Sequence, residues 1–176
     1  MDITVKIIIF GESDVGKTTL TKQYMTGQFE TDMENTMGVN IGIKKIIIEN
    51  LKVVVQIWDL AGDERFEFIF PTFIRGISGG ILIYDITKTS NLNNLDKWIN
   101  LYSSLLSKEV KKTPLLIVGN KLDLQDKRAI YIEEIIKSVG DYKILDIIEC
   151  SAKTGQNVDL AFFRLISEIL RRKGFI

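Results

Sequence analysis

The segment that most constrains this chain is GESDVGKT, residues 11–18, which directly follows the apolar run at 7–10. Its glycines let the backbone fold closely around a polyphosphate, with successive N–H groups pointing inward. Lys17 can place a cation on the outer phosphates, the Thr18 hydroxyl can bind Mg²⁺, and a helix beginning near Gly16 adds its positive N-terminal end. The pattern predicts a strand, a phosphate-binding loop and a helix in succession. The predicted phosphate contacts are Ser13, Asp14, Val15, Gly16, Lys17, Thr18 and Thr19.

Composition narrows the chemistry that can accompany this loop. The 176 residues include no histidine, which removes the commonest general base and the commonest ligand of transition metals. Any metal must therefore be held mainly by oxygen, which favours Mg²⁺ over Zn²⁺. The 23 basic and 23 acidic residues cancel, and this balance favours no nucleic-acid partner. Cys150 is the single cysteine, so no intrachain disulfide can form, as is typical of proteins in a reducing cytosol.

The ends of the sequence lack the usual membrane signals. The first residues do not combine a charged start with an apolar core, and no apolar stretch approaches the length of a membrane span. The last four residues, KGFI, contain no cysteine that could be prenylated. We therefore expect a cytoplasmic protein without an anchor of its own, which reaches membranes only through a partner. Because no long exposed apolar segment demands a second copy, we also expect a monomer.

Apolar strands and amphipathic helices alternate along the chain, a pattern typical of an α/β fold with a mainly parallel six-stranded sheet and helices on both faces. Two strand-like runs meet at Asn50 and predict a hairpin, which supplies one antiparallel strand. The polar segments 29–40 and 60–76 are expected to be long loops, the second with a short helix, of the kind that carry function. Strands are predicted over 3–10, 41–49, 52–58, 81–84, 115–118 and 144–149, and helices over 17–26, 91–107, 131–139 and 158–172, the last capped by Asn157.

A second polar motif, WDLAG, follows the predicted strand at 52–58. An acidic residue at the end of a buried strand is the usual partner of the Mg²⁺ held by a phosphate loop, so Asp59 is a predicted magnesium residue. Gly62 can bring a backbone N–H close to a terminal phosphate. An Asp after a strand can also be a simple cap, and the upstream loop is what favours the metal role.

Two further motifs, NKLD at 120–123 and ECSAK at 149–153, also follow predicted strands. Asp123 can accept two hydrogen bonds from a ring with adjacent N–H and NH₂ donors, an edge that guanine has and adenine lacks. The motif therefore favours GTP over ATP. Ser151 can brace Asp123, and the Ala152 N–H can donate to the guanine carbonyl. The predicted guanine contacts are Asn120, Lys121, whose stem can lie over the base, Asp123, Ser151, Ala152 and Lys153.

Taken in order, these four motifs resemble those of the Ras superfamily of small GTPases over nearly the whole chain. The runs TMGVN at 36–40 and WDLAGDERF at 58–66 are most similar to the Rab branch, as is the region 75–87. The resemblance implies one P-loop NTPase domain over 1–176, which binds GTP and GDP and hydrolyses GTP with Mg²⁺ as a molecular switch.

The resemblance also implies roles that the motifs alone do not. The loops 29–40 and 60–76 would be two switches, ordered by GTP and released after hydrolysis, and would bind effectors, exchange factors and activating proteins. Phe29 would pack against the guanine ring, and Thr36 would touch both Mg²⁺ and the γ-phosphate. The implied magnesium residues are Thr18, Thr36 and Asp59, and the implied catalytic residues are Lys17, Thr36, Gly62 and Asp63.

Two acidic residues depart from the family pattern. Asp63 stands where the family has the glutamine that orients the attacking water. A carboxylate only accepts hydrogen bonds, is one methylene shorter and repels the phosphate charge, so slow intrinsic hydrolysis is one hypothesis, and a nucleotide-dependent scaffold that hardly turns over is its extreme form. The alternative is that Asp63 faces solvent and a partner supplies the catalytic groups. Asp14 stands where many relatives have glycine, and its side chain is expected to face outward.

Overall fold

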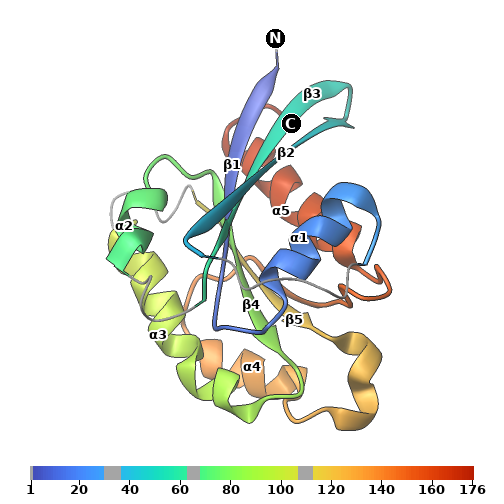
Figure 1. Ribbon diagram of the computed structural model, residues 1–176. Helices are drawn as coiled ribbons and strands as arrows, with labels where there is room; N and C mark the ends of the chain where they lie inside the picture. The colour runs from blue at the N-terminus through green and yellow to red at the C-terminus, as the bar shows by residue number, and fades with distance from the viewer. Residues whose placement is uncertain (1, 30–36, 63–67, 107–112) are drawn as a thin grey trace.

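The computed structural model of this protein describes residues 2–29, 37–62, 68–106 and 113–176. A central six-stranded sheet has the strand order β2-β3-β1-β4-β5-β6, and Figure 1 shows α1 and α5 on one side of it and α2 and α3 on the other. The strands are β1 (Ile3–Phe10), β2 (Val39–Ile48), β3 (Leu51–Leu60), β4 (Gly79–Asp85), β5 (Leu115–Asn120) and β6 (Asp146–Glu149). The helices are α1 (Lys17–Thr26), α2 (Phe70–Phe73), α3 (Thr89–Leu105), η2 (Leu122–Lys127), α4 (Ile132–Val139) and α5 (Val158–Arg172).

The sheet is parallel apart from its edge strand β2, which runs antiparallel to β3. The two strands of this hairpin are joined at Glu49 and Asn50, whose φ values are 47° and 67°. Two consecutive left-handed residues form the kind of turn whose twist matches that of a hairpin. The predicted hairpin and its single antiparallel strand are therefore confirmed.

Each face of the sheet has its own apolar core because alternate side chains of β1 point to opposite faces. Ile7 and Ile9 pack into the core beneath α1 and α5, whereas Ile8 and Phe10 pack into the core beneath α2, α3 and α4. In the second core the Phe10 ring stacks on Tyr102 of α3, with centroids 5.4 Å apart. Coverage on both faces explains why β4 and β5 are buried along their entire length.

The predicted elements are all present, and their bounds differ by a few residues. The strand predicted over 81–84 begins at Gly79, and the helix predicted from 91 begins at Thr89. Asn157 lies at the N-cap position of α5, but the prediction that it caps the helix is wrong. Its side-chain Nδ2 instead donates to the Glu149 carbonyl at 2.9 Å, and its backbone is left-handed.

Candidate nucleotide-binding site

The carboxyl ends of β1, β3, β4 and β5 meet at one edge of the sheet, and the predicted phosphate loop leaves β1 at this edge. Gly16 precedes α1 with φ 92°, and a Cβ there would collide with the side-chain amide of Asn120. Asn120 donates to the Val15 carbonyl at 2.9 Å, so the loop and the NKLD segment are packed together. Ser13 and Asp14 are exposed, as expected for Asp14, whose φ of 62° is a left-handed conformation that aspartate tolerates.

Lys17 lies beneath the loop with only 6% of its surface exposed. Its ammonium donates to the Glu12 carbonyl oxygen at 2.5 Å. Burial lowers the pKa of Lys17 to about 8, although the nearby carboxylates of Asp59, Asp14 and Glu12 oppose that shift. A buried cation in a loop of backbone N–H groups is a site for a multiply charged anion.

Thr18 and Asp59 form the oxygen pair that the sequence predicted for Mg²⁺. The Thr18 hydroxyl donates to Asp59 Oδ2 at 2.5 Å, and Asp59 is fully buried. Its other oxygen, Oδ1, is buried without a hydrogen-bond partner, and burial raises the pKa of this carboxyl to about 6. A buried carboxylate with an unsatisfied oxygen beside a hydroxyl fits a hard cation, because Mg²⁺ binds oxygen ligands of this kind. These two residues would hold the metal.

Gly62 is the second glycine that the site requires. It lies against the Glu12 peptide and the Lys17 ammonium, and any Cβ at this position would overlap both. The structure therefore brings Gly62 next to Lys17, as is needed if both residues are to contact the phosphates. Thr36 and Asp63, the other residues with predicted catalytic roles, lie outside the described residues.

The predicted guanine residues gather where β5 and β6 end. The Ser151 hydroxyl donates to Asp123 Oδ1 at 2.5 Å, which confirms that Ser151 braces this carboxylate. The Ala152 N–H donates to Asn120 Oδ1 at 3.0 Å, so the Asn120 amide links the phosphate loop to the ECSAK segment. Donation from Ala152 to guanine stays a prediction. Phe29 and Lys153 are exposed, and Thr19 is half-buried.

Three residues of this region are not among the site residues predicted from the sequence: Asp85, Asn91 and Glu12. Asp85, which ends β4, forms an ion pair of 2.6 Å with Lys121, whose ammonium also donates to the Asp14 carbonyl at 3.0 Å. Burial alone would raise the pKa of Asp85, but hydrogen bonds from Lys121 and Thr87 outweigh it and the pKa lies below its usual range.

Asp85 could have been found from the sequence, because it comes directly after the apolar run at 81–84, as Asp59 comes directly after the strand predicted over 52–58. Glu12 occupies a variable position of the GESDVGKT motif and Asn91 lies outside the motifs, so the sequence gives neither residue such a signal. The Asn91 amide of α3 donates to the Glu12 carboxylate, and its oxygen accepts the Asp85 N–H at 2.8 Å. Only the folded chain brings these two side chains together.

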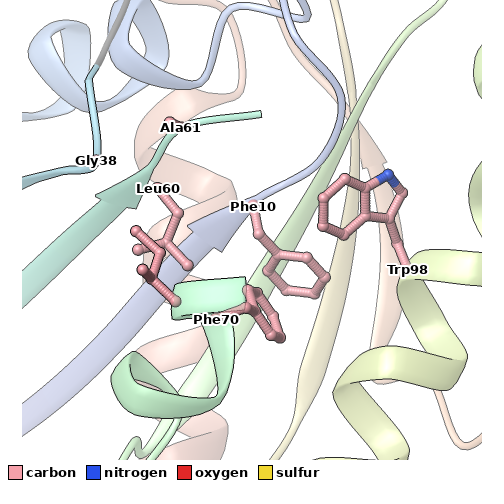
Figure 2. A pocket seen from close by; sticks show the side chains of 7 residues that line it. Phe10, Gly38, Leu60, Ala61, Phe70 and Trp98 are labelled. Atoms are coloured by element: carbon pink, nitrogen blue, oxygen red, sulfur yellow. The ribbon is translucent and has the colours of Figure 1, made fainter. Parts of the chain in front are cut away.

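The ends of the two predicted switch loops meet beside this site. The Ala61 N–H donates to the Gly38 carbonyl at 2.9 Å, so the loops that include 29–40 and 60–76 are joined at their β2 and β3 ends. Beneath them lies an apolar pocket, where Figure 2 shows Phe10 and Phe70 close to one another and Trp98 reaching in from α3. The pocket is lined by Phe10, Gly38, Leu60, Ala61, Ile69, Phe70 and Trp98.

Comparison with known proteins agrees with this geometry. The family model described as Ras family matches residues 6–171. The chain belongs to the Ras family. Relatives include Ras-related protein Rab-8B of Homo sapiens, 37% identical over 171 residues that make up 97% of this chain and 81% of the relative. Ras-related protein Rab-1C of Dictyostelium discoideum is 38% identical over 168 residues, 96% of this chain and 82% of the relative. Rab-19 of Xenopus laevis is 35% identical over 174 residues, 99% of this chain and 80% of the relative.

Membership of this family makes the chain a small, GTP-binding GTPase of the Rab-like kind. The single mainly parallel sheet with one antiparallel strand is the fold expected from the resemblance. Among the helices in the part of the chain that the structure describes, none is long and apolar enough to cross a bilayer.

Proposed function

We propose that this chain is a guanine-nucleotide switch that hydrolyses GTP to GDP and phosphate with Mg²⁺, as one domain over 1–176. The observation that carries the proposal is the arrangement at one edge of the sheet: Lys17 beneath the phosphate loop, the Thr18–Asp59 pair beside it, and Asp123 held by Ser151 at the far end. These three groups are suited to the phosphates, the metal and the base of one nucleotide.

The protein's contribution to hydrolysis is mainly positioning and electrostatics, because phosphoryl transfer needs little covalent chemistry from the enzyme. Lys17 and the loop N–H groups would stabilise negative charge on the phosphates. Thr18, Asp59 and Thr36 would hold Mg²⁺, which neutralises charge that develops on the phosphate oxygens. The Gly62 N–H would approach the terminal phosphate.

Guanine selection would come from the other end of the site. Asp123, braced by Ser151, would accept two hydrogen bonds from the base, while Ala152 and the stem of Lys121 would contact it. The Asn120 amide would keep this end in register with the phosphate loop, since it contacts Val15 and Ala152 together. An adenine ring lacks the paired donors that Asp123 requires.

The proposal has two forms, which differ in the role of Asp63: a slow form, and one in which Asp63 faces solvent. In the slow form, its carboxylate orients water poorly and the protein acts mainly as a nucleotide-dependent scaffold. In the other, an activating protein supplies the missing groups, and a donated arginine is worth about 10³–10⁵-fold in rate. Effectors and regulators would bind through the segments 29–40 and 60–76, and a cytoplasmic monomer would reach membranes through such a partner.

The test is single-turnover hydrolysis of pre-bound GTP by the purified protein with Mg²⁺, beside Asp63→Gln. A wild-type rate well below that of the variant is expected if Asp63 keeps the switch in its GTP form. Equal rates would exclude the slow form. A protein that retains neither GTP nor GDP would overturn the whole proposal.

A further inference from the structure

A ring of polar contacts joins the phosphate loop to the guanine-binding segment through α3. The Asn91 side-chain amide donates to Glu12 Oε2, and its oxygen accepts the Asp85 N–H at 2.8 Å. The Asp85 carboxylate pairs with Lys121 at 2.6 Å, and the Lys121 ammonium returns to the phosphate loop at the Asp14 carbonyl, at 3.0 Å. The ring therefore begins and ends on the same loop.

Asn91 is the member of the ring whose burial and contacts indicate a specific role. Its surface is only 4% exposed, and asparagine is a mostly exposed residue type that is buried at a cost unless its groups are paired. Its amide is used in both directions, as a donor toward a carboxylate and as an acceptor from a backbone N–H. A carboxylate at this position could not donate to Glu12.

The Glu12 side chain is held from a second side as well. Asn94, one turn along α3 from Asn91, donates its amide to Glu12 Oε1, so each carboxylate oxygen has its own partner. These are hydrogen bonds to an ionised group, which are about twice as strong as neutral ones. The helix α3 thereby fixes the side chain of a residue inside the phosphate loop.

The backbone of Glu12 supports two groups that meet the outer phosphates. Its carbonyl accepts the Lys17 ammonium at 2.5 Å, and Gly62 lies against the same peptide. The contacts from Asn91 and Asn94 restrict the Glu12 side chain, and through it they limit the movement of the peptide on which these groups rest. Asn91 is thus linked both to the phosphate end of the site, through Glu12, and to the guanine end, through Asp85 and Lys121.

We propose that Asn91 is a positioning residue of the nucleotide site, which keeps the phosphate loop and the guanine-binding segment in register and so slows nucleotide release. The inference rests on the proposed function, since it assigns Asn91 a role in holding a guanine nucleotide. Asn91 does not touch the nucleotide in this scheme. It acts through Glu12 and Asp85, which separate it from both ends of the site.

The experiment measures release of a fluorescent GDP analogue from the full chain in Mg²⁺ after addition of excess unlabelled GDP. Asn91→Asp replaces the donor by a carboxylate that repels Glu12, while it can still accept the Asp85 N–H. Loss of a hydrogen bond to a charged group predicts release about tenfold faster or more. Asn93→Asp is the matched control, because it makes the same charge change at an exposed position of the same helix, and its release rate should equal that of the wild type.

A double variant distinguishes a positioning role of Asn91 from general damage to the fold. Glu12→Gln combined with Asn91→Asp restores a donor and an acceptor with their directions reversed, so the double variant should release GDP within about threefold of the wild-type rate, since a neutral–charged pair is regained. If Asn91 only stabilised the fold, Asn91→Asp would change the thermal midpoint of unfolding, but the double variant would not restore slow release of GDP. If Asn91→Asp does not fold, Glu12→Ala removes the same contact from the loop side and should also speed release about tenfold.

The outcomes distinguish the inference from its premise. Release from Asn91→Asp no faster than from Asn93→Asp, with wild-type GDP retained, would overturn the inference and leave the proposed function in place. Faster release that the double variant does not reverse would also overturn it. A wild-type chain that binds no guanine nucleotide would overturn both.

Discussion

At the scale of the residue, the candidate site is held by a few polar side chains with specific hydrogen-bond partners. Asp59 presents one oxygen to Thr18 and leaves the other buried without a partner, and Asp123 is held by Ser151. The sequence motifs predicted the identity of these residues and, for Ser151 and Asp123, the contact itself. The side-chain amides of Asn120 and Asn91 link separate segments of the site. Motif spacing predicted a place in the site for Asn120 but not for Asn91.

Asp123→Asn should exchange the base that the site prefers. Loss of the carboxylate acceptor weakens GTP binding by about ten- to a hundredfold, because hydrogen bonds to charged groups are worth about 1.5–3 kcal/mol. The new amide can donate, which favours the carbonyl that xanthine carries there. Competition of GTP and XTP against a fluorescent guanine nucleotide measures the change. Asp126→Asn, exposed on the same short helix η2, is the control, and an unchanged preference in Asp123→Asn would remove the basis for the guanine assignment.

At the scale of the element, α5 was predictable as a helix and its contacts were only partly so. Its apolar stripe predicted the face that packs on the sheet, and Phe162 of that face is fully buried. The Phe162 ring stacks on Tyr24 of α1 with centroids 3.7 Å apart, a pairing that no local pattern contains. The polar end of the helix also has an internal arrangement, because Arg171 and Arg172 both bond Glu168.

Phe162→Ala should cost the fold about 3–5 kcal/mol, the range for truncating a buried aromatic side chain. The neighbouring Phe163→Ala is the matched control, because Phe163 is 55% exposed and should change stability by about 0.5 kcal/mol or less. Urea unfolding of both variants measures the difference. Equal costs for the two changes would contradict the packing of α5 described above.

Glu168 should make the stability of α5 depend on pH. Hydrogen bonds from Arg171, followed by those from Arg172, lower the pKa of Glu168 to about 2, although burial opposes the shift. Because the folded-state pKa lies below the ordinary value of 4.5, this stabilisation is complete above about pH 4.5 and disappears as the pH falls to about 2.

Glu168→Gln should therefore lower the free energy of unfolding by about 1 kcal/mol at pH 7, a value discounted for screening of exposed arginine partners. The deficit should shrink steadily between about pH 4.5 and pH 2. Asp96→Asn, which removes an exposed charge from α3, is the control. A deficit that stays constant over this range would show that the ion pairs are not its cause.

At the scale of the whole molecule, the site exists only because four parallel strands end at one edge of the sheet. The sheet order places together four residues that lie at, or just beyond, the carboxyl ends of different strands: Lys17, Asp59, Asp85 and Asn120. Bound nucleotide would touch segments from nearly the whole chain, so its free energy of binding should appear as stability of the entire domain.

GDP should therefore raise the unfolding temperature, and it should do so most strongly with Mg²⁺. At a GDP concentration about 1,000 times the dissociation constant, the stabilisation is about 4 kcal/mol, or about 8–16 °C for a chain of this size. Chelation of Mg²⁺ with EDTA should reduce the shift, because the buried Asp59 oxygen would lose its cation. Calorimetry with ADP in place of GDP is the control, and an equal shift with ADP would contradict guanine selection.

Elements and motifs were predictable here because both depend on short sequence separations. The period of apolar residues decides between strand and helix, and the GESDVGKT and NKLD motifs each lie within one turn or loop. Only the tertiary structure determined which hydrogen-bond partners the side chains of Asn91 and Asn157 take. Asn91 and Glu12 are 79 positions apart, and Asn157 turned from its helix to the Glu149 carbonyl. The first contact depends on the strand order and on the placement of α3 over the sheet, whereas the second depends on the path of the chain between β6 and α5.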